Sequence, residues 1–134
     1  MRSSVEQECF RLIQQIAVTQ HPFCVRCDQP ATCGHHIYTR SRPATAFLPD
    51  AVLGVCAECH EWIERNPEEA IALAISIIGR KRYEMLEWLS YTVCRFRKQD
   101  YRDIRQELRI RLREGDQADR VAPERLLSGQ LSAS

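Results

Sequence analysis

The chain lacks long hydrophobic runs. Its longest apolar stretch, residues 70–78, is about half of the roughly 20 residues that a membrane-spanning helix needs. The first ten residues, MRSSVEQECF, also lack the apolar segment of a secretory signal peptide. These absences argue against a membrane partner and predict a cytoplasmic location.

The chain also has almost no net charge. The 134 residues contain 19 Lys and Arg against 18 Asp and Glu, which gives a formal net charge of +1. A balance this close to zero neither requires nor excludes a nucleic-acid partner. Basic residues are dense from Arg80 onward, but acidic residues are interleaved with them, which is also typical of a solvated helix face.

Cysteine is plentiful, but its pattern lacks the features of a disulfide scaffold. The number of cysteines is odd, seven, and four of them form two C-x-x-C pairs. In a reducing compartment, short paired spacings indicate a metal site rather than disulfides.

Segments with helical periodicity flank a central segment that has little of it. We expect one domain over residues 1–114, in the order helix 5–19, zinc-braced core 23–66 and helical extension 67–114. Short strands are expected near 35–38 and 51–55 within the core. Further helices are expected at 56–65, 67–78, 80–90 and 98–113. Residues 115–134 have too little apolar patterning to fold and are predicted to be a flexible tail.

The two C-x-x-C pairs predict a structural zinc site. Cys24 and Cys27 form the first pair, and Cys56 and Cys59 form the second. Each tight turn presents two thiolates on one side, so two turns complete a tetrahedral site with no open position. The alternatives are buried thiols or a redox dithiol. Cys33 is close enough in sequence to substitute for one ligand.

Three histidines and one glutamate lie inside or just after this frame. His60 and Glu64 are four residues apart on an expected helix, so their side chains share one face and can close on a single ion. Together with His35 they would leave coordination positions for water and substrate, which is typical of a catalytic metal site. His36 alternates with His35 on an expected strand, and its ordinary pKa near neutrality suits a general base. Alternatively, these residues are solvated surface groups, or a histidine replaces a cysteine at the zinc.

The order of these motifs resembles the HNH, or ββα-metal, endonucleases, especially the small zinc-stabilised ones of phages and prophages. The string that carries the resemblance is CVRC…GHHIYTRSRPATAFLPDAVLGVCAECHEWIERNPEEA, which covers roughly residues 23–70. The resemblance implies an α+β fold. Its centre would be a ββα-metal, treble-clef-like zinc core with a short β-hairpin, flanked by N-terminal and C-terminal α-helices.

The resemblance also implies hydrolysis of DNA phosphodiester bonds, in phage recombination or DNA processing in a phage or bacterial host. His36 would activate the attacking water. His35, His60 and Glu64 would hold Mg²⁺ or Mn²⁺, with other divalent ions acceptable, beside the structural Zn²⁺. Glu64 stands where the family has its last histidine.

One further departure concerns the family's central asparagine, which orients the general base. It would be expected near Ala51, where this sequence offers Asp50. A carboxylate accepts a hydrogen bond from an imidazole, so Asp50 is the candidate orienter of His36.

Four arginines are candidates for contacting DNA, which we expect as the partner. Arg40 and Arg42 lie in the basic loop after the His-His strand, and Arg105 and Arg109 recur at helical spacing near the end of the chain. The last helix is alternatively a solvated surface or a homodimer contact. Two other functions remain open: a catalytically inactive zinc-stabilised nucleic-acid-binding module, and a helical protein–protein adaptor.

Overall fold

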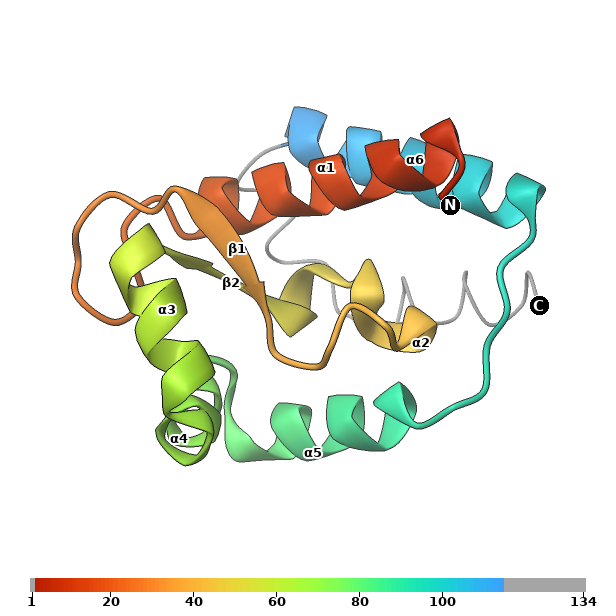
Figure 1. The fold of residues 1–134 in the computed structure, drawn as a ribbon. Helices are drawn as coiled ribbons and strands as arrows, with labels where there is room; N and C mark the ends of the chain where they lie inside the picture. The colour runs from red at the N-terminus through yellow and green to blue at the C-terminus, as the bar shows by residue number, and fades with distance from the viewer. Residues whose placement is uncertain (1, 115–134) are drawn as a thin grey trace.

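The computed structural model describes residues 2–114, and the predicted tail at 115–134 lies outside this part. The fold is mixed α and β, mostly helical, with one small antiparallel hairpin at its centre (Figure 1). The elements follow in the order α1 (Ser4–Gln20), β1 (Cys33–His36), α2 (Pro43–Ala46), η1 (Pro49–Ala51), β2 (Val52–Val55), α3 (Ala57–Arg65), α4 (Pro67–Ile78), α5 (Arg80–Ser90) and α6 (Lys98–Glu114). None of these helices is long and apolar enough to cross a membrane.

Local signals in the sequence place the helix boundaries. The Ser3 hydroxyl accepts a hydrogen bond of 3.3 Å from the backbone N–H of Glu6, which caps α1. Proline at the first helical position begins both α2 and α4, because its fixed φ suits a helix start. Gly79 separates α4 from α5 at a φ of 90°, a conformation that favours glycine. The expected helices are therefore present with small shifts at their ends.

The hairpin pairs β1 with β2 in an antiparallel register, with His36 opposite Val52 and His35 opposite Leu53. The first strand begins two residues earlier than expected, because Cys33 still pairs with Val55. The chain between the strands is also more ordered than the expected proline-rich connection, since it contains α2 and η1.

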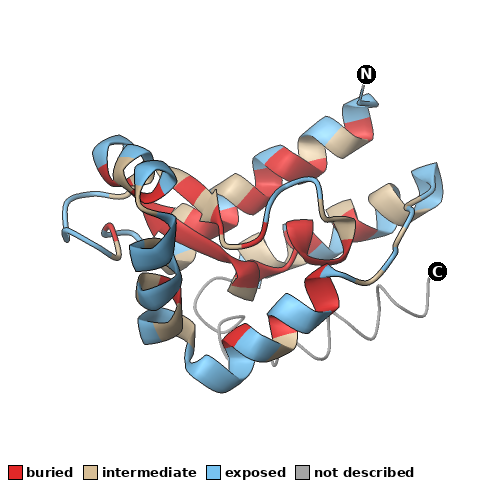
Figure 2. Cartoon of the chain, turned by 60° about the horizontal axis from the view of Figure 1, so that its bottom comes forward, coloured by how far each residue is buried: buried red, intermediate tan, exposed pale blue. Residues whose placement is uncertain are grey.

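Two hydrophobic clusters cover the two faces of the hairpin. Val52 faces the cluster that α1 and α6 build, whereas Leu53 faces the cluster built mainly by α3, α4 and α5. All four residues of β2 are buried as a result. Figure 2 shows the same arrangement, with burial concentrated on the hairpin and on the helix sides that face it.

Helix α1 lies directly against the hairpin because two glycines leave room for it. Gly34 and Gly54 are register partners. A Cβ on Gly54 would lie 2.4 Å from the backbone oxygen of His21, and one on Gly34 would lie 2.7 Å from the Cβ of Ala17. The C-terminal end of α1, and the cysteine loop that follows it, are thereby placed beside β2.

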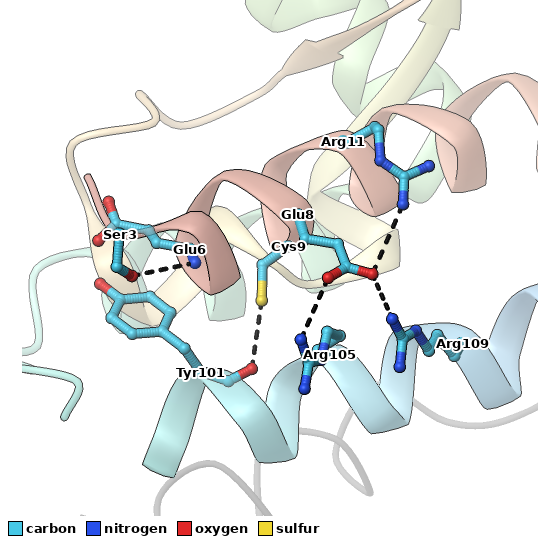
Figure 3. A network of polar contacts seen from close by, with 8 residues as sticks. All are labelled: Ser3, Glu6, Glu8, Cys9, Arg11, Tyr101, Arg105 and Arg109. Atoms are coloured by element: carbon cyan, nitrogen blue, oxygen red, sulfur yellow. Dashed lines mark hydrogen bonds and ion pairs between the residues drawn. The ribbon is translucent and has the colours of Figure 1, made fainter. Parts of the chain in front are cut away.

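A carboxylate on α1 ties this helix to α6. Glu8 contacts Arg105 at 3.1 Å and also Arg109, while Arg11 approaches it at 3.6 Å from α1 itself (Figure 3). The hydrogen bond from Arg109, and that from Arg105, hold the pKa of Glu8 below its usual value of 4.5, although partial burial opposes them.

The lowered pKa of Glu8 predicts that its carboxylate stabilises the folded protein by an amount that depends on pH. Because the folded pKa of Glu8 is depressed, its contribution is present above the unfolded pKa and is lost as the pH falls through the folded pKa. Glu8→Gln should lower the melting temperature by a few degrees near pH 7, and the difference from wild type should shrink in acid. Glu61→Gln is the matched control, since Glu61 pairs with Arg65 on the exposed surface of α3. A pH-independent difference would contradict the ion-pair explanation.

Candidate metal centre and adjoining groove

Four cysteines from two separate segments gather at one end of the hairpin. The Sγ atoms of Cys24, Cys27, Cys56 and Cys59 all lie within 4.8 Å of one another. Zn–S bonds of about 2.3 Å place the sulfurs of a tetrahedral site about 3.8 Å apart, and Cys27 and Cys56 are separated by 3.6 Å. The group can therefore hold a metal such as zinc. Among residues 2–114, no other set of histidine, cysteine or acidic side chains gathers as such a group.

Backbone hydrogen bonds shape the first cysteine turn and attach it to β2. The Cys24 N–H donates to the Gln29 carbonyl at 2.6 Å, and Asp28, at a φ of 66°, donates to the Cys24 carbonyl at 2.9 Å. The Val25 N–H donates to the Gly54 carbonyl at 3.1 Å. The hairpin thereby places the first pair beside the second.

The second pair is built into the start of α3. Cys56 is the N-cap of this helix, and its sulfur accepts a hydrogen bond of 3.4 Å from the Cys59 N–H. Burial opposes the thiolate of Cys24, but N–H groups of Cys56, Arg26 and Cys27 outweigh burial and hold the pKa of Cys24 below its usual value. The thiolate is the form that binds a metal.

Arg26, inside the first pair, also acts on this centre. Its guanidinium lies 3.6 Å from the centroid of the Trp62 ring and donates to the Cys59 sulfur at 3.5 Å. Burial raises the pKa of Cys59 to about 12, and the hydrogen bond from Arg26 opposes this rise. The positive charge also offsets the negative charge that four thiolates would carry. Cys33 lies outside the group, and its sulfur donates to the Val55 carbonyl at 3.5 Å.

In the structure His60 lies close to His35 on one side and to Glu64 on the other. The rings of His35 on β1 and His60 on α3 are 5.6 Å apart between centroids, and His60 Nδ1 lies 3.7 Å from a Glu64 carboxylate oxygen. Burial, with the neighbouring His60, lowers the pKa of His35 to about 4, so its imidazole is neutral at pH 7 and has a lone pair for a metal. Among residues 2–114 these three side chains do not gather into a group that could hold a metal ion, as the four cysteines do.

A groove of about 350 Å³ adjoins this pair of histidines. Its lining includes His35 and Glu64, but not His60, together with Arg42, Glu87 and Tyr91. The guanidinium of Arg42 lies over the Tyr91 ring, 4.2 Å from its centroid, and donates to the Ser90 hydroxyl at 2.9 Å. The groove thus combines an imidazole and carboxylates with a cation suited to phosphate.

His36 points to the opposite face of the hairpin. Its ring is 8% exposed, packs near Phe10 and lies 3.0 Å from the Ala46 carbonyl through Nε2. A carbonyl can only accept, so Nε2 carries the proton and Nδ1 keeps its lone pair. Burial lowers the pKa of His36, which keeps the ring neutral. It has the protonation state of a base, but it is not among the residues that line the groove, and its general-base role remains a prediction.

Asp50 lies in a different environment from the one expected. Its carboxylate is 2.8 Å from the Arg82 guanidinium, and it lines a second hollow of about 290 Å³ with His21 and Arg111. Within residues 2–114 no hydrogen bond joins it to His36, and the Ala46 carbonyl fixes the ring instead. A backbone oxygen leaves no signature in a sequence, so this partner could not be predicted.

The candidate DNA-contacting arginines fall into two groups. Arg105 and Arg109 on α6 bind the Glu8 carboxylate, which neutralises part of their charge (Figure 3). Arg40, which lies over the Phe10 ring at 4.6 Å, and Arg42 have no ion pair with any carboxylate in the described part of the chain. The loop arginines are therefore the freer cations.

Comparison with known proteins found no relative of this chain. No family model matches the chain, and neither a curated protein nor a solved structure matches it. The motif order and the geometry of the cysteine group and the groove are therefore the features that bear on its function.

Proposed function

We propose that this chain is a metal-dependent endonuclease of the HNH type that hydrolyses DNA phosphodiester bonds. The observation that carries the proposal is that His60 lies close to both His35 and Glu64, and that these last two line a groove that also contains Arg42. A metal-ligand set with room for substrate and an adjacent cation are what phosphodiester hydrolysis requires. We infer a role in phage recombination or DNA processing from the resemblance alone.

The four-cysteine group is proposed to bind a structural Zn²⁺. Four thiolates leave no open coordination position, so the ion has no direct part in chemistry. In the proposed ββα-metal, treble-clef-like core, this site joins the loop after α1 to the start of α3. It therefore sets His35 on β1 against His60 on α3.

His35, His60 and Glu64 are proposed to hold the second ion, since two imidazoles and a carboxylate suit a divalent metal. Mg²⁺ or Mn²⁺ bound there would stabilise the charge that develops on the phosphate and acidify a bound water. Arg42 would position the phosphate. A water oxygen would bond to phosphorus as the bond to the 3′ oxygen breaks, with the water proton released and a proton taken up by the 3′ oxygen. The general-base role of His36 is proposed from the resemblance alone, because its ring lies on the opposite face of the hairpin, against Phe10 and the Ala46 carbonyl.

The proposal is tested by incubating the purified protein with plasmid and branched DNA across a series of divalent ions. We expect nicking or cleavage that requires an added ion such as Mg²⁺ or Mn²⁺ and leaves 5′-phosphate and 3′-hydroxyl ends. DNA binding without cleavage under every ion would instead favour the inactive nucleic-acid-binding module. Absence of binding even at low salt, where phosphate contacts are strongest, would favour the protein–protein adaptor.

A further inference from the structure

Two large aromatic side chains are exposed near the end of α5. Trp88 is 74% exposed and Tyr91 is 68% exposed. They are three residues apart at the end of one helix, a spacing that places side chains near one another. Exposed rings of this size are uncommon on a surface with no partner. A large aromatic ring left in water forgoes more hydrophobic stabilisation than a smaller side chain does.

Basic residues lie beside Tyr91 or follow it in the chain, and one carboxylate, Glu87, lines the same groove as Tyr91. Arg42 lies over Tyr91, and Arg95, Arg97 and Lys98 follow it in the chain, all three of them exposed. Among residues 2–114, none of these four forms an ion pair with a carboxylate, in contrast to Arg105 and Arg109 on α6. A ligand that carries several negative charges and also offers flat apolar faces would satisfy both features. Nucleic acid has this combination, whereas an apolar protein segment would leave the cations unpaired.

The aromatic surface is continuous with the candidate catalytic groove. Tyr91 and Arg42 line the same groove of about 350 Å³ as His35 and Glu64. Its volume falls within the range of small-ligand sites. A nucleotide that entered there would have its base near Tyr91 and its phosphate near Arg42, in the groove that His35 and Glu64 also line.

We propose that this groove binds an unpaired nucleotide, with its base stacked on Tyr91 and its phosphate contacted by Arg42. A base inside a continuous duplex has both faces covered by its neighbours, so only an unpaired or extruded base can use the ring. The preferred substrate is therefore nucleic acid with a single-stranded segment, such as a fork, flap or single strand. This inference rests on the proposed function in taking nucleic acid as the ligand.

The test compares binding of one labelled oligonucleotide as a single strand, as a fork with a single-stranded arm and as a blunt duplex. Fluorescence anisotropy is measured without added divalent ion, so that binding is separated from cleavage. Wild type should bind the single strand and the fork more tightly than the duplex. Tyr91→Ala should weaken binding to the first two roughly tenfold, the size expected for one base–aromatic stack, with little effect on the duplex.

Two further variants separate stacking from general surface effects. Tyr91→Phe keeps the ring and should bind like wild type. Val93→Ala alters a side chain that is 97% exposed but has no ring, and it should leave every affinity unchanged. Because Tyr91 is exposed, its replacement should not unfold the protein, and an unchanged melting temperature would check this.

The outcomes separate this inference from the proposed function. Equal affinity for single strand and duplex, or an unaltered affinity in Tyr91→Ala, would overturn the stacking site even if DNA is cleaved. Tyr91-dependent binding without cleavage under any ion would leave the site in place and remove the nuclease. Self-association of wild type in sedimentation that Tyr91→Ala abolishes, without a change in DNA affinity, would show a contact between copies and overturn the inference.

Discussion

Removal of the metal from the four-cysteine site is expected to unfold the hairpin and α3. The site joins the loop after α1 to Cys56 and Cys59 at the start of α3. Otherwise a few contacts hold the loop to the rest of the fold, such as the hydrogen bonds from Val25 to Gly54 and from Thr32 to Val55. Structural zinc contributes about 10–16 kcal/mol in small zinc domains, comparable with the whole stability of a typical domain, about 5–15 kcal/mol. The loss should therefore remove most of the cooperative unfolding transition.

The measurement is zinc content by mass spectrometry together with thermal unfolding by circular dichroism. Wild type should contain about one zinc per chain, as four thiolates bind one ion. Cys56→Ser combined with Cys59→Ser should lose the metal and the transition. Cys33→Ser is the matched control, because Cys33 lies next to the group but outside it. Loss of zinc from Cys33→Ser, or a zinc-free wild type with reduced thiols and an unchanged transition, would contradict the assignment.

Replacement of the two histidines that serve the proposed chemistry is expected to reduce DNA cleavage at least about 100-fold, the size of general acid–base or metal contributions. His60→Ala removes a metal ligand, so its loss should be partly recovered at high concentrations of Mn²⁺. His36→Ala removes the base, so added metal should not restore its rate. Initial rates of plasmid nicking across metal concentrations distinguish the two variants.

The pH profile gives a second readout for His36. Its pKa is lowered from 6.5 by burial, so the neutral form that accepts a proton predominates above that lowered value. Wild-type activity should therefore fall in acid, at a pH below 6.5. His36→Ala should change the shape of this acid limb, and only the part that comes from protonation of the metal ligands should persist. His36→Asn, which retains a hydrogen-bond donor for the Ala46 carbonyl, serves as a folding control. Full activity in His36→Ala would assign the buried ring a packing role, as its 8% exposure also allows.

Local patterns in the sequence were sufficient for the helices and for the four-cysteine group. The cap at Ser3, proline at the start of α4 and Gly79 between α4 and α5 act within a few residues, so a reader of the sequence can locate them. The spacing within each C-x-x-C pair is likewise local. The expected α+β class is consistent with a mostly helical chain that contains one hairpin.

Ion pairs between residues that are distant in the sequence could be identified only from the tertiary structure. Arg105 and Arg109 pair with Glu8 on α1, and Asp50 pairs with Arg82 on α5. Each partner lies on another helix, and the sequence offers many equivalent charges. No periodicity indicates which carboxylate an arginine will meet, because that choice depends on how the helices pack.

The sequence by itself was enough to predict that four cysteines can bind one metal ion and that His35 and His36 alternate along an extended segment. Only the tertiary structure decided where each histidine lies, with His35 toward α3 and the groove and His36 buried against α1. The physical reason is that strand alternation assigns opposite faces, whereas the helices packed on each face decide which one is open. Here α1 closes one face through the Gly34–Gly54 contact, and the groove remains on the other.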